Sequence, residues 1–555
     1  MKLYMMSDSM TITGGGIRMK LEFIGAAHEV TGSCHFIHWQ DRSILVDCGM
    51  EQGADIYENQ ELPVKASDID YVFVTHAHID HSGLLPLLAQ QGFKGQIFAT
   101  DATSQLCQIM LKDSAHIQEF EAEWKNRKAR RAGQAEVEPM YTMADAESAI
   151  SLFVPCPYNE VLQVTEGLKV RFRDAGHLLG SSFIEFWFTE DGKETKIVFS
   201  GDLGNGNRPL IKDPAWPDTA DYLVIESTYG NRNHETPPDY AVLMAELLEK
   251  TFRRGGNVVI PAFSVGRTQE MLYHLRRIKE ENMIQTNADF EVYVDSPLAV
   301  EATTIFNRNV LECFREESVE MIRCGKNPIR FDGLKTSVTS DDSKRINFDM
   351  KPKVILSASG MCEAGRIRHH LKHNLWRPEC TILFVGYQVP GTLGYNLLHG
   401  AEEVKLFGER IRVKAEIVNL PGISGHADRD HLTEWVGHMH EMPKRIFVVH
   451  GEDQVTDEFA AHLAQTFHVE AAAPYSGDVY DLDTNTCIVT GSRKPAEAKK
   501  KGPAKVAATA FAKLLEAGNR LIAIIHKNQG LANKDMAKFT SQIQSLCDKW
   551  DRDDV

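Results

Sequence analysis

The chain has 555 residues and a formal net charge of −16, with 43% hydrophobic and 25% charged residues. A chain of this length normally has more than one hydrophobic core, so two large domains are expected. The sequence contains no apolar run long enough for a transmembrane helix, and its acidic balance argues against non-specific adhesion to nucleic acid. We therefore predict a cytoplasmic protein with no membrane partner.

Residues 1–18 lack an apolar core of signal-peptide length. They are predicted to be a disordered leader, and Met19 is an alternative start. The ten cysteines are scattered without a C-x-x-C pair, so a zinc ribbon and a thioredoxin-type motif are both excluded.

A repeated pattern runs through the first 230 residues: a short apolar run stops at an ionisable residue. Short apolar runs bounded by turn signals predict buried strands, and ligands in α/β folds gather at the carboxyl ends of strands. The runs are SILVDCG with Asp47, IDYVFVTHAHIDH with a histidine cluster, KVRFRDAGH with His177, KIVFSGDLG with Asp202 and DYLVIESTYG with Glu226.

The next stretch, of about 190 residues, has few histidines at strand ends, although its own strands and helices alternate. It includes the predicted strands NVVIPAFSVGR and KVILSASG, and the predicted helices YAVLMAELLEKTFRR and RTQEMLYHLRRIKEE. The first pattern then resumes in GISGHADRDHL, which contains His426, and in KRIFVVHGE, which contains His450. An α/β domain inserted into another α/β domain explains this interruption.

Two further segments are unusual in composition. Residues 112–139 are highly charged and predict a solvated helix. After residue 491 a basic linker, RKPAEAKKKGPAK, precedes two short amphipathic patterns. These predict a small helical tail, for which an ordinary docked helix is favoured over a partner, RNA or dimer contact.

The stretch THAHIDHSG at residues 75–83 places four metal-binding side chains within six positions. Imidazole and carboxylate ligands suit Zn²⁺, with Mn²⁺ or iron as alternatives. His76 and His78 alternate on an extended segment, as two ligands of one ion would. Asp80 and His81 are adjacent and point apart, so they can serve a different ion. Surface histidines beside a helix N-terminus would explain a lone histidine, but not this cluster.

The cluster is not a complete site, because a catalytic zinc normally has at least three protein ligands. His177, Asp202 and His450 at other strand ends can supply the missing ligands. Each has a simpler alternative when taken alone, since a histidine before glycine can be a turn residue and an aspartate can cap a helix. These simpler alternatives are less favoured because all three residues lie at strand ends of one fold.

Taken together, these motifs resemble a known family. H-x-H-x-D-H, AGHLLG and SGD resemble the metallo-β-lactamase superfamily. ESTYG, GISGHAD and VVHGE are similar to the three additional motifs of its β-CASP nucleases, and the insert's PAFSVGRTQE and SASGMCEAGRIRHHL match that group as well. The sequence is most similar to bacterial and archaeal homologues of the endonuclease subunit of the cleavage and polyadenylation specificity factor, over about residues 19–490.

The resemblance implies an αββα metallo-β-lactamase sandwich with an inserted, doubly wound β-CASP domain. The domains would be 19–230 and 415–490 for the sandwich, 231–414 for the insert, and 491–555 for the linker and helical tail. It also implies a homodimer and two zinc ions, with manganese as an alternative. The implied ligands are His76, His78 and His177 for the first ion, Asp80, His81 and His450 for the second, and Asp202 as a bridge.

The remaining site residues follow from the same resemblance. Asp47 would orient a ligand histidine by hydrogen bonding. Glu226 and His426 would form the proton-donating unit beside the metals, although His426 could also be a neighbour of a helix N-cap. Asp80 would be essential for catalysis because it would bind a metal ion. Phosphate contacts are predicted at Arg267, Ser357 and Ser359, with a structural ion pair or a simple turn as the alternatives.

The expected activity is hydrolysis of RNA phosphodiesters by a hydroxide that bridges two metals, in an endonuclease or 5′→3′ exonuclease mode. His450 favours RNA, because RNA-acting members of the family carry histidine in the last motif and DNA-repair members carry valine. The alternatives are a DNA nuclease, a small-molecule hydrolase and a non-catalytic scaffold. The long insert argues against a small substrate, and the intact ligands argue against a scaffold.

Overall fold

The computed structural model describes residues 19–52, 57, 59–206, 208–420, 422, 424–495, 521–522, 524–525 and 533–550. The chain divides into two compact units, Met1–Pro495 and Ala496–Val555. The predicted leader and the first helical pattern of the tail lie outside the described residues. The second tail pattern forms α16 (Asn533–Trp550). Among the described residues, no helix has the length and apolar character needed to cross a membrane.

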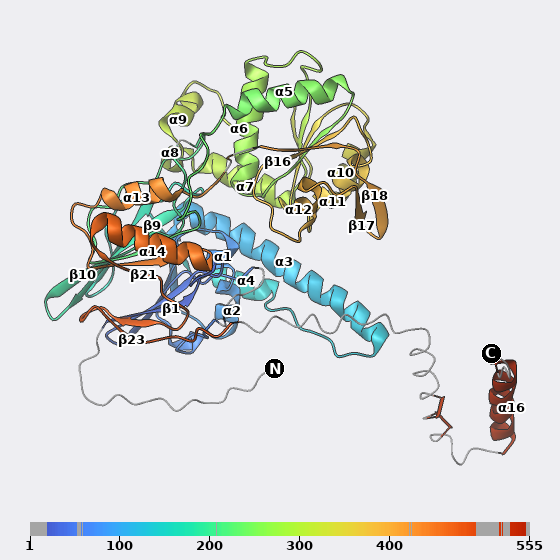
Figure 1. Cartoon of the computed structure of the whole chain (residues 1–555), viewed down its shortest axis with the longest axis horizontal. Coiled ribbons are helices and arrows are strands. Elements are labelled where there is room, and N and C mark those ends of the chain that lie inside the picture. Colours follow the sequence, from blue (N-terminus) through green and yellow to red (C-terminus); the bar gives the residue numbers. More distant parts are fainter. Residues whose placement is uncertain are drawn as a thin grey trace. The chain divides into compact units, whose positions relative to one another are not determined.

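Two mixed sheets form the centre of the first domain (Figure 1). The eight-stranded sheet has the order β23-β22-β1-β2-β3-β4-β5-β6, and the seven-stranded sheet has the order β21-β20-β11-β10-β9-β8-β7. The first contains β1 (Lys20–Gly25), β2 (Cys34–Trp39), β3 (Arg42–Val46), β4 (Tyr71–Phe73), β5 (Gln96–Thr100), β6 (Phe153–Cys156), β22 (Val479–Asp481) and β23 (Thr486–Val489). The second contains β7 (Leu162–Thr165), β8 (Leu168–Asp174), β9 (Ser182–Glu190), β10 (Lys193–Phe199), β11 (Tyr222–Glu226), β20 (Arg445–Val449) and β21 (Glu470–Ala472).

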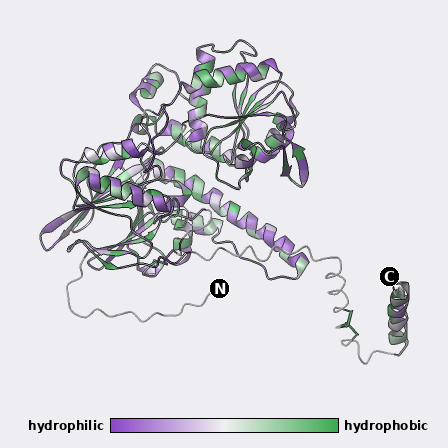
Figure 2. Ribbon diagram, viewed as in Figure 1, coloured by the Kyte–Doolittle hydropathy of each residue, from purple (hydrophilic) through white to green (hydrophobic). Residues whose placement is uncertain are grey.

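The two sheets pack against each other through large aromatic side chains. Phe23 and Phe73 of the first sheet share one core with Phe186 and Phe447 of the second. Helices cover both outer faces, which gives four layers, and the sheets are correspondingly apolar in Figure 2. The helices are α1 (Ile79–Ser82), α2 (Leu85–Gln90), α3 (Asp101–Ala132) and α4 (Met143–Ile150) on one side, with α13 (Arg429–Gly437) and α14 (Asp453–Phe467) on the other.

The predicted insert has its own six-stranded parallel sheet in the order β14-β13-β15-β12-β16-β19. Neighbouring residues of β12 face opposite sides: Val258 packs with α5 and α6, whereas Val259 packs with α11 and α12. The insert is therefore wound on both faces, as predicted. Its strands are β12 (Val258–Pro261), β13 (Val292–Val294), β14 (Leu334–Thr336), β15 (Val354–Ser357), β16 (Thr381–Phe384) and β19 (Glu416–Asn419), with the hairpin β17 (Glu403–Leu406) and β18 (Glu409–Arg412). Its helices are α5 (Tyr240–Arg253), α6 (Arg267–Glu280), α7 (Pro297–Arg308), α8 (Val310–Cys313), α9 (Glu316–Arg323), α10 (Ser340–Phe348), α11 (Ile367–Asn374) and α12 (Leu393–Leu398).

One predicted boundary differs from the observed sheet. We placed the end of the insert at residue 414, but β19 pairs with β16 and extends the insert's sheet to Asn419. The segment EIVN is short and only half-buried, so it has no strong strand pattern in the sequence. After it, the chain returns to the sandwich, where β20 lies parallel to β11.

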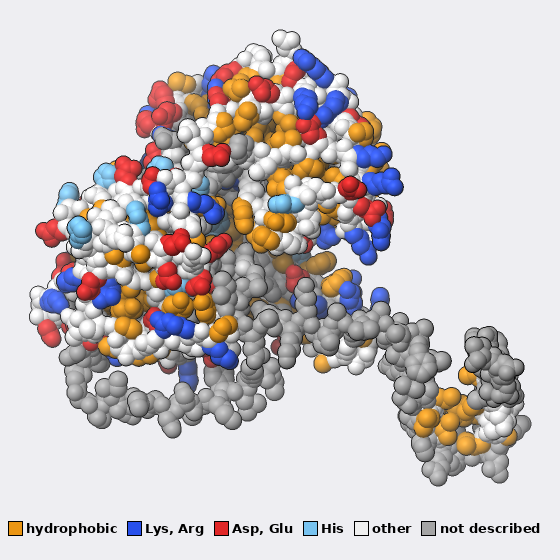
Figure 3. All heavy atoms as spheres, in the orientation of Figure 1, with side chains coloured by type: hydrophobic (Ala, Val, Ile, Leu, Met, Phe, Trp, Pro, Cys, Tyr) orange, Lys and Arg blue, Asp and Glu red, His pale blue; other side chains and the backbone are white. Residues whose placement is uncertain are grey.

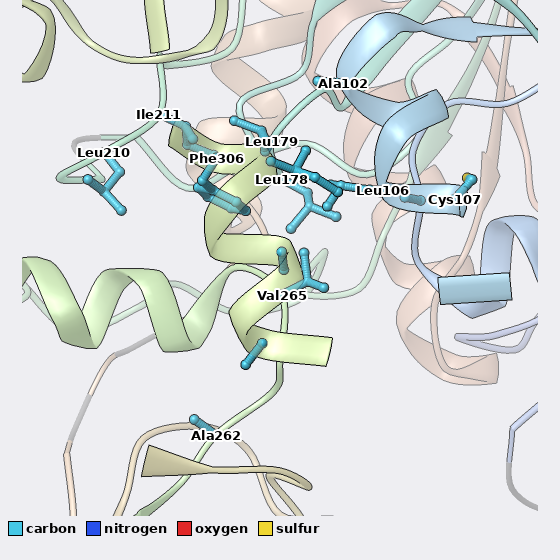
Figure 4. Packing of buried hydrophobic residues seen from close by; sticks show 14 of the residues in the cluster. Ala102, Leu106, Cys107, Leu178, Leu179, Leu210, Ile211, Ala262, Val265 and Phe306 are labelled. Atoms are coloured by element: carbon cyan, nitrogen blue, oxygen red, sulfur yellow. The ribbon is translucent and has the colours of Figure 1, made fainter. Parts of the chain in front are cut away.

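The two domains also share an apolar contact. Leu178 and Leu179 of the sandwich belong to the same buried cluster as Val265 and Phe306 of the insert (Figure 4). Leu178 directly follows His177, so this contact lies next to one of the predicted metal ligands.

Candidate metal centre

The predicted ligands come from the carboxyl ends of strands and the loops that follow them. β10, β11 and β20 are parallel neighbours, so Asp202 after β10 and His450 after β20 emerge at one edge of their sheet, next to Glu226 at the end of β11. The histidine cluster follows β4 of the facing sheet and continues into α1. The sandwich therefore brings residues from four separate stretches of the chain into one place.

The first group of candidate ligands consists of His76, His78, His177 and Asp202. Nδ1 of His78 lies 3.0 Å from Nε2 of His76 and 3.2 Å from Nε2 of His177. Asp202 Oδ2 lies 3.5 Å from Nε2 of His76 and 3.6 Å from Nε2 of His177.

The second group consists of Asp80, His81 and His450. Nε2 of His81 and Nε2 of His450 are 3.1 Å apart, and the latter lies 3.8 Å from Asp80 Oδ2. Asp202 faces this group with its other oxygen, Oδ1, which is 3.3 Å from His81 Nε2 and 3.6 Å from His450 Nε2.

The donor atoms fit a pair of cations. Imidazole nitrogens converge with carboxylate oxygens at separations typical of ligands around one ion, and the two groups share Asp202. Asp202 Oδ1 is buried and has no hydrogen-bond partner among the described residues, although such an atom is costly to bury unpaired. An oxygen in this position is suited to bind a cation.

Four of the five candidate ligand histidines also have a partner on the nitrogen that faces away from the group, which fixes the ring orientation. Asp47 Oδ2 is 2.6 Å from His81 Nδ1, and Thr75 Oγ1 is 3.2 Å from His76 Nδ1. Thr228 Oγ1 is 3.1 Å from His450 Nδ1, and the carbonyl oxygen of Gly425 is 3.1 Å from His177 Nδ1.

Of these four partners only Asp47 was predicted, and the two threonines and the Gly425 carbonyl were not. Thr75 precedes the histidine cluster, and Thr228 lies within ESTYG, so each stood beside a motif that was already in view. A threonine next to a strand end that carries a candidate ligand could have indicated these partners.

The electrostatics of the site favour neutral ligands in the first group. Burial lowers the pKa of His78, and it holds the pKa values of His76 and His177 well below their ordinary range. Burial opposes the charge on Asp202, but the neighbouring histidines, His450 and His81 first, keep its pKa well below its usual range. The Asp202 carboxylate is therefore ionised beside the neutral imidazoles of the first group. Burial lowers the pKa of His81 in the second group, but the carboxylates of Asp202 and Asp47 outweigh it and raise the pKa well above its usual range.

Glu226 and His426 form a pair beside the ligands. Nδ1 of His426 is 3.1 Å from Glu226 Oε2 and 3.8 Å from Asp202 Oδ2. Glu226 is held by the backbone N–H of Leu203 at 2.6 Å. Burial lowers the pKa of His426, but the carboxylates of Glu226 and Asp202 outweigh it and raise the pKa to about 9. The N-cap of α13 is Asp428, so His426 precedes the helix in the loop that faces the ligands.

The three predicted phosphate contacts differ in their surroundings. Arg267 Nη1 lies 2.5 Å from Glu270 Oε2, and the Ser357 hydroxyl is buried and donates to the carbonyl of Asp295 at 2.8 Å. These contacts favour the structural alternatives for both residues. Ser359 is half-buried, and its hydroxyl makes a long contact of 3.4 Å with Ala364 O.

A four-layered αββα sandwich with two groups of histidine and aspartate ligands at one sheet edge defines a metallo-hydrolase of the metallo-β-lactamase type. Comparison with known families agrees. Residues 29–103 match the metallo-β-lactamase superfamily, residues 268–397 match the Beta-Casp domain, and residues 410–474 match the Zn-dependent metallo-hydrolase RNA specificity domain.

Named relatives narrow the family further. The chain is 36% identical over 441 residues to a protein named Ribonuclease TTHA0252 from Thermus thermophilus, covering 79% of this chain and 94% of the relative. It is 30% identical over 471 residues to Transcription termination factor FttA of Methanosarcina mazei, covering 82% and 70%. The same-named factor of Methanocaldococcus jannaschii is 29% identical over 481 residues, covering 84% and 72%.

The chain belongs to the β-CASP family of metallo-β-lactamase-fold hydrolases. The predicted family, the predicted fold class and the prediction of an enzyme are confirmed by these matches. Membership of this Zn-dependent family implies that the protein binds a divalent metal.

Proposed function

We propose that this protein is a zinc-dependent ribonuclease that hydrolyses RNA phosphodiester bonds at the centre formed by the two ligand groups. The observation that carries the proposal is the position of Asp202 between the two groups, with Glu226 and His426 beside it. This arrangement offers two adjacent cation positions and one proton-carrying pair, which is what an in-line displacement at phosphorus needs.

The proposed metals are two zinc ions, with manganese as an alternative. One ion would be held by His76, His78 and His177, and the other ion by Asp80, His81 and His450. Asp202 would bind both ions. When bound, such a pair supplies an activated water and positive charge for the phosphoryl oxygens.

The residues of the chain have separate tasks in this proposal. Asp47 accepts a hydrogen bond from His81 Nδ1 and so directs Nε2 toward the centre. His426 is the proposed general acid for the leaving 3′ oxygen, because its ring faces the centre and Glu226 fixes it through Nδ1. Nε2 of His426 is then the nitrogen that carries the donated proton.

RNA is the proposed substrate because the chain matches an RNA specificity domain and its relatives include a named ribonuclease. The acidic chain also carries basic side chains where a polyanion could be held. Exposed Lys405, Arg410 and Arg412 lie on the β17–β18 hairpin, where blue side chains gather on the right of Figure 3. Ser359 remains a proposed phosphate contact, and the same role for Arg267 or Ser357 would require each to leave its present partner.

The direct test is cleavage of labelled RNA and of DNA with the same sequence by the purified protein. We expect RNA to be cut, cutting to stop when a chelator removes the metal, and Zn²⁺ or Mn²⁺ to restore it. Preferential cutting of DNA would overturn the RNA assignment, and no cutting of either nucleic acid would leave the small-molecule hydrolase and the scaffold as alternatives. RNAs that differ only in their 5′ end would separate the endonuclease mode from the 5′→3′ exonuclease mode.

The family resemblance also implies a homodimer, which we propose with a cytoplasmic location. Helix α3 offers a surface for a second copy, since Ile117, Phe120 and Trp124 follow one another at helical spacing and are 45%, 58% and 51% exposed. Sedimentation of the wild type and of Trp124→Glu tests this surface: we expect a dimer for the wild type and a monomer for Trp124→Glu.

The proposed cytoplasmic location is tested separately by fractionation of cells.

A further inference from the structure

A buried ion-pair network connects the insert to a metal ligand of the sandwich. Arg208, in the segment that follows Asp202, donates through Nη1 to the backbone carbonyl of His177. The same guanidinium donates through Nε to Glu270 Oε1 at 2.7 Å, and its Nη2 contacts that oxygen too. Glu270 lies in the first turn of α6, so the network crosses from one domain to the other.

Each member of the network is largely removed from solvent. The side chains of Arg208, Glu270 and Arg267 are 11%, 9% and 13% exposed. Glu270 uses one oxygen for Arg208 and the other for Arg267, which lies 2.5 Å away. Two charged donors thus fix both oxygens of the carboxylate, and hydrogen bonds of this kind are roughly twice as strong as neutral ones.

The backbone beside the network is closely packed at Gly266. This residue precedes α6 with a φ of +83°, and a Cβ at this position would lie 3.1 Å from Leu178 Cδ1. Gly425, whose carbonyl faces His177 Nδ1, is also near Arg208: a Cβ there would lie 3.9 Å from Arg208 Nη1, at ordinary van der Waals distance. Arg208 therefore lies beside both His177 and the loop that carries His426.

Arg208 provides the one of three hydrogen bonds to His177 described here that depends on the insert. The amide of His177 donates to Ser181 Oγ at 3.0 Å, and its ring is fixed by the Gly425 carbonyl, both within the sandwich. Its carbonyl oxygen is fixed by Arg208, whose orientation depends on Glu270 of the insert.

We propose that Glu270 is a positioning residue for the metal ligand His177, acting across the domain boundary through Arg208. The insert then helps to set the geometry of the first cation position. The inference rests on the proposed metal site, but not on the identity of the nucleic acid. Arg208 contacts the ligand directly and Glu270 acts through it; mutation of residues that contact a metal ligand typically changes metal affinity or activity by about 10- to 100-fold.

The test uses Co²⁺ alone as the probe, added to the metal-free full-length protein, with its affinity and visible absorption spectrum as readouts. Two variants break the network at different points: Glu270→Gln removes the charge that orients Arg208, and Arg208→Met removes the donor to His177. Both are expected to weaken binding of one Co²⁺ by about 10-fold or more and to change its spectrum.

A matched control separates positioning from general destabilisation. Glu185 on β9 is also a buried carboxylate with two cationic partners, Arg171 and Lys196 at 2.5 and 2.7 Å. Glu185→Gln is expected to lower the thermal midpoint but to leave the Co²⁺ spectrum and affinity as in the wild type. Because no RNA is present, these readouts hold whether or not the protein cleaves RNA.

Either of two results would overturn the inference: wild-type Co²⁺ binding in both network variants, or an equal change in Glu185→Gln. If Glu270→Gln does not fold, the Co²⁺ spectrum of Arg208→Lys tests the inference instead. A lysine keeps the charge but cannot reach both Glu270 and the His177 carbonyl, so it should fold and still show the altered spectrum.

Discussion

Asp47 Oδ2 and His81 Nδ1 are 2.6 Å apart, and this contact lies on the side of the imidazole opposite to Nε2, which faces Asp202. Asp47 is itself fixed by the backbone N–H and the hydroxyl of Thr75, at 2.8 and 3.0 Å, and by Ser33 Oγ at 3.1 Å. The carboxylate is thus a rigid acceptor for the N–H at Nδ1 of His81, and it directs Nε2 toward the proposed cation position.

Asp47→Asn should therefore weaken metal binding at the second position, by about 10- to 100-fold, without unfolding the sandwich. The amide offers an N–H where His81 needs an acceptor, so the ring would turn or change tautomer. Chelator competition measures the affinity, and Asp41→Asn, at an exposed aspartate, is the control. Unchanged affinity in Asp47→Asn would show that His81 is oriented by other contacts.

Asp80→Asn removes a proposed ligand itself, so its effect on cleavage should exceed that of Asp47→Asn. We expect a loss of at least about 100-fold in cleavage rate, beyond the usual range for an orienting partner. Metal analysis should show the second ion lost and the first retained. Activity that survives in a folded Asp80→Asn protein would mean that the second metal position is wrongly assigned.

His426→Ala should slow cleavage of RNA by about 100- to 10,000-fold, as expected for loss of a general acid. The loss should be much smaller for bis(p-nitrophenyl) phosphate, because p-nitrophenolate leaves without protonation. Comparing the two substrates on one protein preparation cancels differences in metal content. An equal loss on both would exclude the general-acid role and point to a role in site structure.

Asp295 provides a prediction about pH and stability that does not involve the metal centre. Its buried carboxylate lies 2.6 Å from His370 Nε2 and from Ser343 Oγ, and 2.7 Å from Arg366 Nη1. Burial raises the pKa of Asp295, but these partners, His370 first, outweigh it and hold the pKa well below its ordinary range. Asp295→Asn should destabilise the protein by about 3 kcal/mol at pH 7, since it breaks a buried pair.

The sign of the pH dependence follows from the lowered pKa. The stabilisation is fully present above the unfolded value of about 3.9 and is lost as pH falls through the lower folded value. The difference in thermal midpoint between wild type and Asp295→Asn, both metal-free, should therefore narrow below about pH 4. The exposed Asp289→Asn is the control, and a difference that stays constant with pH would refute the assignment.

The sequence predicted the strand ends well, because each ligand follows an apolar run that must be buried. It could not predict the network of Arg208 and Glu270, since Arg208 lies in an irregular segment and its partners are fixed only by the docking of two domains. The same holds for Ser357, whose hydroxyl is satisfied by Asp295 from another strand. β19 extends the insert's sheet past the predicted boundary at residue 414, and the sequence does not indicate this strand because it is half-buried and lacks a strong pattern.

His81 and His450 are 369 positions apart in the chain, with the whole insert between them, yet their ring nitrogens are 3.1 Å apart. This spacing sets an order of events during synthesis. A growing chain on the ribosome has the histidine cluster early, but it lacks His450 until β20 has been made and has paired with β11. The proposed second cation position therefore lacks one of its three ligands in a nascent or truncated chain that ends before residue 450.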